Sequence, residues 1–232
     1  MSGSAAFFDK FRGYFGGLSQ NQVDGANAIL AATFGLPLKH RAYMLATAWH
    51  ETAHTLQPIE EIGKGAGHPY GQPDGPWHHV YYGRGYVQLT WLKNYIRANT
   101  ALHAGMFIKP NEDLVRDPDL VMRPDIAAAI MVHGMSEGWF TGKKLADYTD
   151  YLNMRRVING TDRADLIASY AFKFEECVKA DMAAQPAPGA TVSAPPRVSP
   201  PPPAKPAPAS PVGLLAIILN ILSILFSRKA TK

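Results

Sequence analysis

Proline is concentrated in one part of this chain. Eleven of the 19 prolines lie between Pro186 and Pro211. Each proline fixes φ and has no amide hydrogen to donate, so we expect residues 182–211 to form an extended, semi-rigid linker. Fully extended, this linker would span about 90 Å at ~3.1 Å per residue. It separates a globular part, residues 1–181, from a terminal segment, residues 212–232.

The charges divide at the same place. Residues 182–232 contain five basic residues and no Asp or Glu, so residues 1–181 hold 18 of the 23 Lys and Arg and all 19 Asp and Glu. A nearly neutral globular part lacks the basic face of a nucleic-acid-binding domain, and we expect no nucleic-acid partner.

The hydrophobic fraction of 47% excludes a chain that is disordered throughout. The single cysteine, Cys177, excludes an internal disulfide framework and a multi-cysteine zinc site.

The terminal segment is apolar and ends in basic residues. Residues 212–227 carry no charge, and Arg228, Lys229 and Lys232 follow them. As a helix, these sixteen residues would be about 24 Å long, short of the ~30 Å hydrocarbon core of a bilayer. We therefore expect contact with membrane lipid, through a short anchor or a helix lying in the interface, rather than a buried core helix. A stripe of small and polar residues along this segment would also suit self-association; it consists of Ala216, Asn220, Ser223 and Ser227.

The first residues do not resemble a secretory signal, because FFDKFRGYF mixes charges into its aromatic side chains. We therefore expect synthesis in the cytoplasm and membrane association through residues 212–232. The topology in the membrane stays open.

Helical patterns dominate residues 1–181. The apolar spacing and the cap residues predict helices over about residues 7–15, 19–34, 38–54, 91–99, 125–136, 148–158 and 164–180. Ser19, Thr90 and Thr161 are the expected N-cap residues. Residues 63–77 contain five glycines and three prolines, which predicts a long loop of a kind that is usually functional or mobile. Residues 81–90 have short strand character, so we expect a mainly α-helical domain with at most one small β element.

Glu51 is the first candidate catalytic residue. It follows the uncharged stretch 42–49 and lies near the C-terminus of a predicted buried helix. Burial and the negative end of the helix dipole both favour a protonated carboxyl group, which suits a general acid near neutral pH. The alternative is a structural helix-end glutamate paired with a neighbouring base such as Lys39 or Arg41.

A second carboxylate follows nine or ten residues later, at Glu60 or Glu61. An acid at a helix end and a base on a loop form a workable pair for sugar hydrolysis. In the inverting reaction the two carboxyl groups stand about 6.5–9.5 Å apart and admit a water between them. The alternative is a solvated acidic patch on the loop.

Residues 50–54, which include Glu51, also match a zinc-peptidase pattern. His50, Glu51 and His54 form HExxH, in which a helix would aim both imidazoles at one metal with the glutamate as base. The third ligand would be Glu60 or a loop histidine, for which the candidates are His68, His78 and His79. The pattern has only three specified residues, so chance matches are common, and we expect no metal and no cofactor.

Three motifs together resemble the catalytic domain of glycoside hydrolase family 19, which contains chitinases and phage or bacterial cell-wall lysins. They are AWHETAHTLQPIEE, YYGRGYVQLTWLKNY and RRVING, and they span roughly residues 19–181 in the order found in the family. The second motif is long and specific. The resemblance implies a lysozyme-like, two-lobed helical fold of the endolysin type, and the tail from residue 182 lies outside it.

The resemblance also implies site residues. Glu51 matches the general acid, Glu60 the general base with Glu61 as second choice, and Thr90 the hydroxyl that helps hold the attacking water. Residues matching positions that line the sugar cleft are Gln88, Asn94, Tyr95 and Asn159. Arg84 and Arg156 match arginines that hold the architecture of the cleft. His54 would then orient the region of Glu51.

The implied function is an inverting hydrolase of a β-1,4-linked, N-acetylated glycan at the cell wall. Peptidoglycan is favoured over chitin, because the chain has an apolar, basic tail and no cysteine-rich chitin-binding module. The alternatives are a chitinase that acts on chitin oligomers, a zinc peptidase of the cell wall and a non-catalytic, membrane-tethered wall-binding protein.

Overall fold

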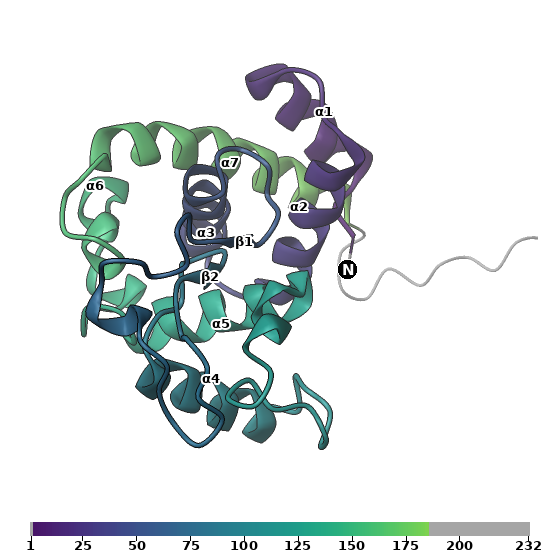
Figure 1. The fold of residues 1–232 in the computed structure, drawn as a ribbon. Helices are drawn as coiled ribbons and strands as arrows, with labels where there is room; N and C mark the ends of the chain where they lie inside the picture. Colours follow the sequence, from purple (N-terminus) through teal and green to yellow (C-terminus); the bar gives the residue numbers. More distant parts are fainter. Residues whose placement is uncertain (1, 186–232) are drawn as a thin grey trace, which may run out of the picture. The chain divides into compact units, whose positions relative to one another are not determined.

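Seven α-helices and one two-stranded sheet make up residues 2–185, the part of the chain that the computed structural model describes (Figure 1). The helices are α1 (Ala5–Phe15), α2 (Gln20–Ala32), α3 (Leu38–Glu51), α4 (Leu92–Ala104), α5 (Pro124–Glu137), α6 (Tyr151–Met154) and α7 (Ala164–Ala184). The strands are β1 (Ile59–Glu60) and β2 (Arg84–Gly85), which pair antiparallel. Short 3-10 turns are η1 (Pro69–Gly71), η2 (Pro118–Met122), η3 (Leu145–Asp147) and η4 (Arg155–Val157). The prediction of a mainly helical domain with one small sheet is confirmed.

The helix α3 runs through the core. Every residue from Arg41 to Trp49 is buried, as the absence of charge over residues 42–49 predicted. The long helix α7 packs along α3, and α1 and α6 pack against α7 (Figure 1). On the other side of the domain, α5 packs against α2, α4 and η2. The C-terminus of α3 is therefore held from several directions.

Aromatic side chains join the N-terminal helix to this core. The ring of Phe11 lies 5.5 Å from that of Trp49 and 5.1 Å from that of Phe174. Phe15 stacks on Phe174 at 4.9 Å. The helical spacing of the phenylalanines in residues 7–15 is thus the pattern of a helix that buries one face.

The predicted cap residues have mixed outcomes. Ser19 caps α2 in a capping box with Gln22, as expected. Thr90 does not cap α4, because the helix starts one residue later, after Trp91 at φ 70°. Thr161 does not cap α7, whose N-cap is Arg163 at φ 55°. In both cases a residue with left-handed backbone conformation ends the preceding turn, so the chain enters the helix without the extended cap geometry that a threonine uses.

The helix α3 ends at Glu51, three residues before the predicted end at His54. Ala53 and His54 both have positive φ, at 48° and 69°, and this conformation cannot continue a right-handed helix. The Thr52 hydroxyl donates to the carbonyl of Ala48 at 2.8 Å and accepts the amide of Leu56 at 2.9 Å. The chain therefore turns back immediately after Glu51.

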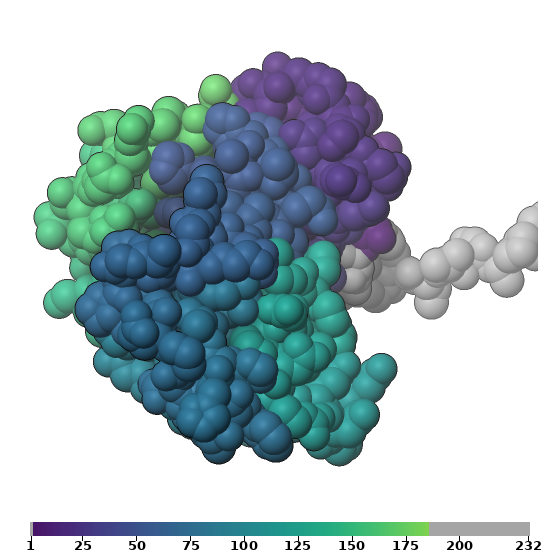
Figure 2. Space-filling view, viewed as in Figure 1, coloured from purple at the N-terminus to yellow at the C-terminus, as the bar shows by residue number. Residues whose placement is uncertain are grey.

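The predicted loop over residues 63–77 is confirmed, with η1 as its one regular element. In the space-filling view, the segment around residues 60–90, in blue, covers the middle of the face, with α1 and α2 in purple and α7 in green above it (Figure 2). The sheet pairs the start of this segment with its later part, since Glu60 aligns with Arg84.

The last helix extends beyond the predicted start of the linker. α7 runs to Ala184, three residues past the boundary at 181. No helix within residues 2–185 has the length and apolarity needed to cross a bilayer. The rest of the predicted linker and the predicted apolar helix at 212–232 lie outside the described residues.

Candidate active site

Glu51 forms an ion pair with a buried arginine. Its side chain is 21% exposed, and Arg155 donates from Nη1 to Glu51 Oε1 at 2.7 Å. Arg155 itself is 2% exposed, and its Nε donates to the carbonyl of Asp162 at 2.8 Å. The guanidinium is therefore fixed by η4 and the turn after it, and it fixes one carboxylate oxygen of Glu51.

This partner is not one that the sequence indicated. Lys39 bonds to the carbonyl of Thr149, and Arg41 faces Asp181 at 3.8 Å. Arg156, which the resemblance assigned to the architecture of the cleft, is exposed and contacts Asn153. The 3-10 turn η4 instead directs Arg155 inward. Two adjacent arginines carry no local signal that decides which one is buried.

Glu60 lies on β1 with three polar neighbours. Tyr82 donates to Glu60 Oε1 at 2.6 Å, and Lys64 lies 3.0 Å from Oε2. Arg84 Nε is 4.0 Å from Oε1. The hydrogen bonds from Tyr82 and then Lys64 lower the pKa of Glu60 below its ordinary value. The carboxylate is therefore ionised at neutral pH, the state that a general base requires.

Glu61, the residue that follows β1, has different partners. Tyr70 donates to Glu61 Oε1 at 2.9 Å, and the amide of Gly83 donates to Oε2 at 3.0 Å. Gln88 lies on the same side, since a side chain at Gly83 would meet both Gln88 Oε1 and Glu61 Oε2. Gln88 Nε2 also donates to the carbonyl of Ile59 at 3.2 Å.

A buried arginine supports the Glu60 side as well. Arg84 is 4% exposed, and its guanidinium lies 3.6 Å from the ring centre of Tyr82. It also bonds to Asp119 and to the hydroxyl of Tyr95. Arg84 therefore lies among the groups that surround the Glu60 carboxylate. Tyr95 is 0% exposed and so presents no surface to a sugar; its hydroxyl accepts from Arg84 and donates to the Tyr82 carbonyl.

The remaining predicted residues are more exposed. Thr90 is half-buried, and its carbonyl accepts from Asn94 Nδ2 at 2.8 Å. Asn159 is exposed, and its amide bonds to the carbonyl of Arg155, which puts it next to the arginine that holds Glu51.

The turn between the two glutamates is tightly held. Leu56 is fully buried with φ 53°, and its carbonyl accepts from the Tyr86 hydroxyl at 3.2 Å. The helix α2 contacts the same carbonyl through Gly25, where an added Cβ would lie 1.8 Å from Leu56 O. Gln22 on α2 also bonds to the carbonyl of His54 at 2.9 Å. The positions of Glu51 and Glu60 are therefore set by a turn that is clamped on both sides.

The zinc interpretation requires His50 and His54 one turn apart on a helix, and this geometry is not formed. His54 lies beyond the end of α3, where its ring stacks on that of Trp49 at 4.7 Å and meets the Tyr170 hydroxyl at 3.3 Å. Within residues 2–185, no three histidine, cysteine or acidic side chains are grouped as metal ligands. The loop histidines have other contacts; for example, His68 stacks on Tyr70.

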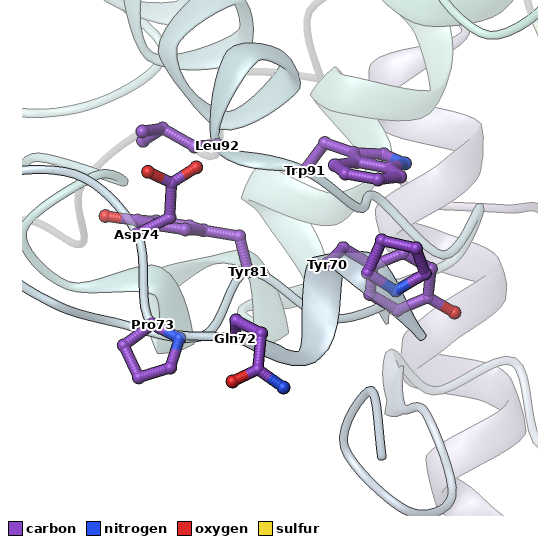
Figure 3. A pocket seen from close by; sticks show the side chains of 8 residues that line it. Tyr70, Gln72, Pro73, Asp74, Tyr81, Trp91 and Leu92 are labelled. Atoms are coloured by element: carbon purple, nitrogen blue, oxygen red, sulfur yellow. The ribbon is translucent and has the colours of Figure 1, made fainter. Parts of the chain in front are cut away.

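A cavity of about 110 Å³ adjoins the Glu61 side of the site (Figure 3). Tyr70 belongs to both, and its ring lies edge-on to that of Trp91 at 5.3 Å. Figure 3 shows Asp74 and Gln72 among the polar groups at its wall. Aromatic faces next to carboxylate and amide groups are suited to a polyhydroxylated ligand.

Comparisons with known proteins identify the fold. No protein-family model and no curated protein matches the chain. Among solved structures, it is similar to chitinase C from Streptomyces griseus HUT6037, with a TM-score of 0.51 and 22% identity over 74% of each chain. It is also similar to a point mutant of chitinase C, with a TM-score of 0.50 and 22% identity over 74% of each chain. The globular part therefore has a chitinase-like fold, as the sequence motifs implied.

Proposed function

We propose that this protein is a glycoside hydrolase that cleaves a β-1,4-linked, N-acetylated glycan with inversion. The proposal is based on two carboxylates that have different partners. Glu51 forms an ion pair with the buried Arg155. Glu60 accepts a hydrogen bond from Tyr82 and pairs with Lys64, and both interactions favour its ionised form. The two carboxylates are nine residues apart in sequence and are joined by a clamped turn. The similarity to chitinase C supports a glycan as the substrate.

The proposed mechanism assigns one role to each carboxylate. Glu51 protonates the glycosidic oxygen, and Oε2 is the donating atom because Arg155 holds Oε1. Glu60 takes a proton from a water that Thr90 helps to hold. The water attacks the anomeric carbon from the opposite face, and the bond to the leaving sugar breaks. The ionised carboxylate also stabilises the positive charge that develops on the sugar ring.

Peptidoglycan is the substrate that we propose, and chitin is the second candidate because both similar solved structures are of chitinase C. Arg228, Lys229 and Lys232 after an apolar stretch suit anionic lipid, which favours an enzyme that works close to a membrane and a cell wall. In this proposal residues 212–232 contact the membrane and also allow self-association. Binding to lipid vesicles by the full chain is the measurement that tests the contact.

The experiment is turnover on both polymers by the wild-type chain and by Glu51→Gln and Glu60→Gln. Mass analysis of the products from peptidoglycan and from chitin oligomers identifies the bond that is cut and the sugar on each side. We expect each variant to stay folded and to lose at least about 100-fold in kcat, since a general acid or base contributes roughly 10²–10⁴-fold. Glu176→Gln, at an exposed α7 position that pairs with Lys179, is the matched control.

Three outcomes would contradict the proposal in different ways. Retained activity in Glu51→Gln would remove the acid assignment, and products cut at a peptide bond would indicate a peptidase. A wild-type chain that binds peptidoglycan or chitin without turnover would be a non-catalytic wall-binding protein.

A further inference from the structure

The cavity beside Glu61 is small, and its wall combines apolar and polar groups. Its volume is about 110 Å³, well below the ~300–1,000 Å³ of a pocket that encloses a whole small molecule. It therefore takes one substituent of a larger ligand rather than a complete ligand. Aromatic rings, a leucine and prolines form most of the wall, while Gln72 adds an amide group and Asp74 a carboxylate (Figure 3).

Trp91 supplies the largest ring of this wall. Its φ of 70° is uncommon for a residue with a side chain. The conformation is held on both sides, since the Trp91 amide donates to the carbonyl of Tyr81 and its carbonyl accepts the amide of Asn94, both at 2.9 Å. The side chain is nevertheless 41% exposed. Strained residues cluster at binding sites, so a strained tryptophan with an exposed ring at a cavity indicates contact with a ligand.

Tyr70 forms the adjoining part of the wall and is fixed in place. Its hydroxyl donates to Glu61 Oε1 at 2.9 Å, and its ring meets that of Trp91 edge-on at 5.3 Å. The turn η1 that carries it is packed closely, because a Cβ at Gly71 would lie 1.8 Å from the carbonyl oxygen of Gly65. The two rings are therefore positioned before any ligand binds.

Asp74 is held beside the start of α4. Its amide donates to the carbonyl of His79 at 2.9 Å. The next residue, Gly75, packs on Leu92, since a Cβ at Gly75 would lie 2.9 Å from Leu92 Cδ2. Asp74 Oδ1 accepts the amide of Gly75 at 2.7 Å, which leaves Oδ2 for a ligand.

These groups match the parts of an acetamido group. Its N–H is a donor for the Asp74 carboxylate, and a bond to a charged acceptor is strong. Its carbonyl oxygen accepts from the Gln72 amide, and its methyl group packs on the aromatic rings. An ammonium group would also use the carboxylate and the ring faces, but it gains nothing from the leucine and the prolines.

We propose that this cavity binds the acetamido group of one sugar of the glycan and thereby selects an N-acetylated strand over a deacetylated one. This rests on the proposed function. Tyr70 is bonded to Glu61, the neighbour of Glu60, and Trp91 follows Thr90, so the cavity adjoins both the proposed base and the residue that helps to hold the water. Asp74 and Trp91 determine specificity in this proposal and take no part in the proton transfers.

The test measures dissociation constants on the Glu51→Gln chain, which binds the glycan without consuming it. The probes are short soluble strands of chitin and of peptidoglycan, each in N-acetylated and in deacetylated form. The N-acetylated strands should bind more tightly than the deacetylated ones.

Asp74→Asn and Trp91→Leu are then added singly. In Asp74→Asn the amide oxygen keeps the bond from Gly75 and the NH2 group faces the N–H of the ligand, so N-acetylated strands should bind about three- to tenfold more weakly. Deacetylated strands should be affected less. Trp91→Leu should weaken binding of the N-acetylated strands about two- to tenfold. Melting temperatures check that each variant is folded.

Trp77→Leu is the matched control, because it removes a 51% exposed tryptophan that does not line this cavity. It should leave the dissociation constants unchanged. Wild-type binding of the N-acetylated strands in both Asp74→Asn and Trp91→Leu would overturn this proposal. A larger loss for the deacetylated strands in Asp74→Asn would also overturn it and would identify an ammonium site. A wild-type chain that cuts neither polymer, while Glu51→Gln binds the strands, would overturn the proposed function alone.

Discussion

Replacing Tyr82 by phenylalanine should raise the pKa of Glu60 and move the acid limb of kcat/KM to higher pH. Tyr82 donates to Glu60 Oε1 at 2.6 Å, and this bond is the first cause of the lowered pKa of Glu60, ahead of Lys64. The ionised carboxylate is the base, so activity falls when the pH drops through that pKa. With one donor removed, the fall begins at a higher pH.

The size of the shift follows from the geometry. A hydrogen bond to a charged acceptor contributes about 1.5–3 kcal/mol, and one pKa unit corresponds to about 1.4 kcal/mol. The Glu60 side chain is 33% exposed, so water replaces part of the lost donor. About half of the contribution or less should remain, which gives a shift of roughly 0.5–1 unit.

The assay is kcat/KM on a soluble oligosaccharide from acid to neutral pH, which reports the free enzyme. Phenylalanine keeps the ring that lies 3.6 Å from the Arg84 guanidinium, so the packing is preserved. Tyr151→Phe is the matched control, because it removes an equally short bond of 2.6 Å, to Glu175 on α7. In the control the acid limb should not move.

An acid limb at the wild-type pH in Tyr82→Phe would refute this reasoning. Lys64→Met provides an independent check, since it removes the second donor and should shift the limb in the same direction. If neither variant moves the limb, Glu60 is not the base, and Glu61, held by Tyr70, becomes the candidate.

Two further predictions concern the turn and the tail. Gly25→Ala places a Cβ 1.8 Å from the carbonyl oxygen of Leu56. The free energy of unfolding, measured with urea, should fall by about 1–3 kcal/mol. The kcat should also fall, because the added methyl group moves the turn between the two carboxylates. An unchanged unfolding midpoint would show that α2 does not clamp this turn. Deletion of residues 212–232 should abolish binding to anionic lipid vesicles while hydrolysis of a soluble substrate persists, and vesicle binding that survives the deletion would place the lipid contact elsewhere.

Local sequence signals predicted most of the helical framework. The uncharged stretch 42–49 is buried because a helix without charge has no face that requires water. Ser19 begins α2 because a serine followed three residues later by glutamine satisfies two free amides. The predictions fail where tertiary contacts impose left-handed conformations, as at His54, which ends α3 early, and at Trp91, which displaces Thr90 from the cap.

The sequence by itself determined the helical class of the globular part, and its motifs selected Glu51 and Glu60 as candidates. Only the tertiary structure decided how each one is held. Arg155 meets Glu51 from 104 positions away, and Tyr82 meets Glu60 from 22 positions away. Helix periodicity and capping act over a few residues, so they are visible in the sequence. A buried ion pair depends on the path of the whole chain, and for that reason nothing local distinguished Arg155 from Arg156.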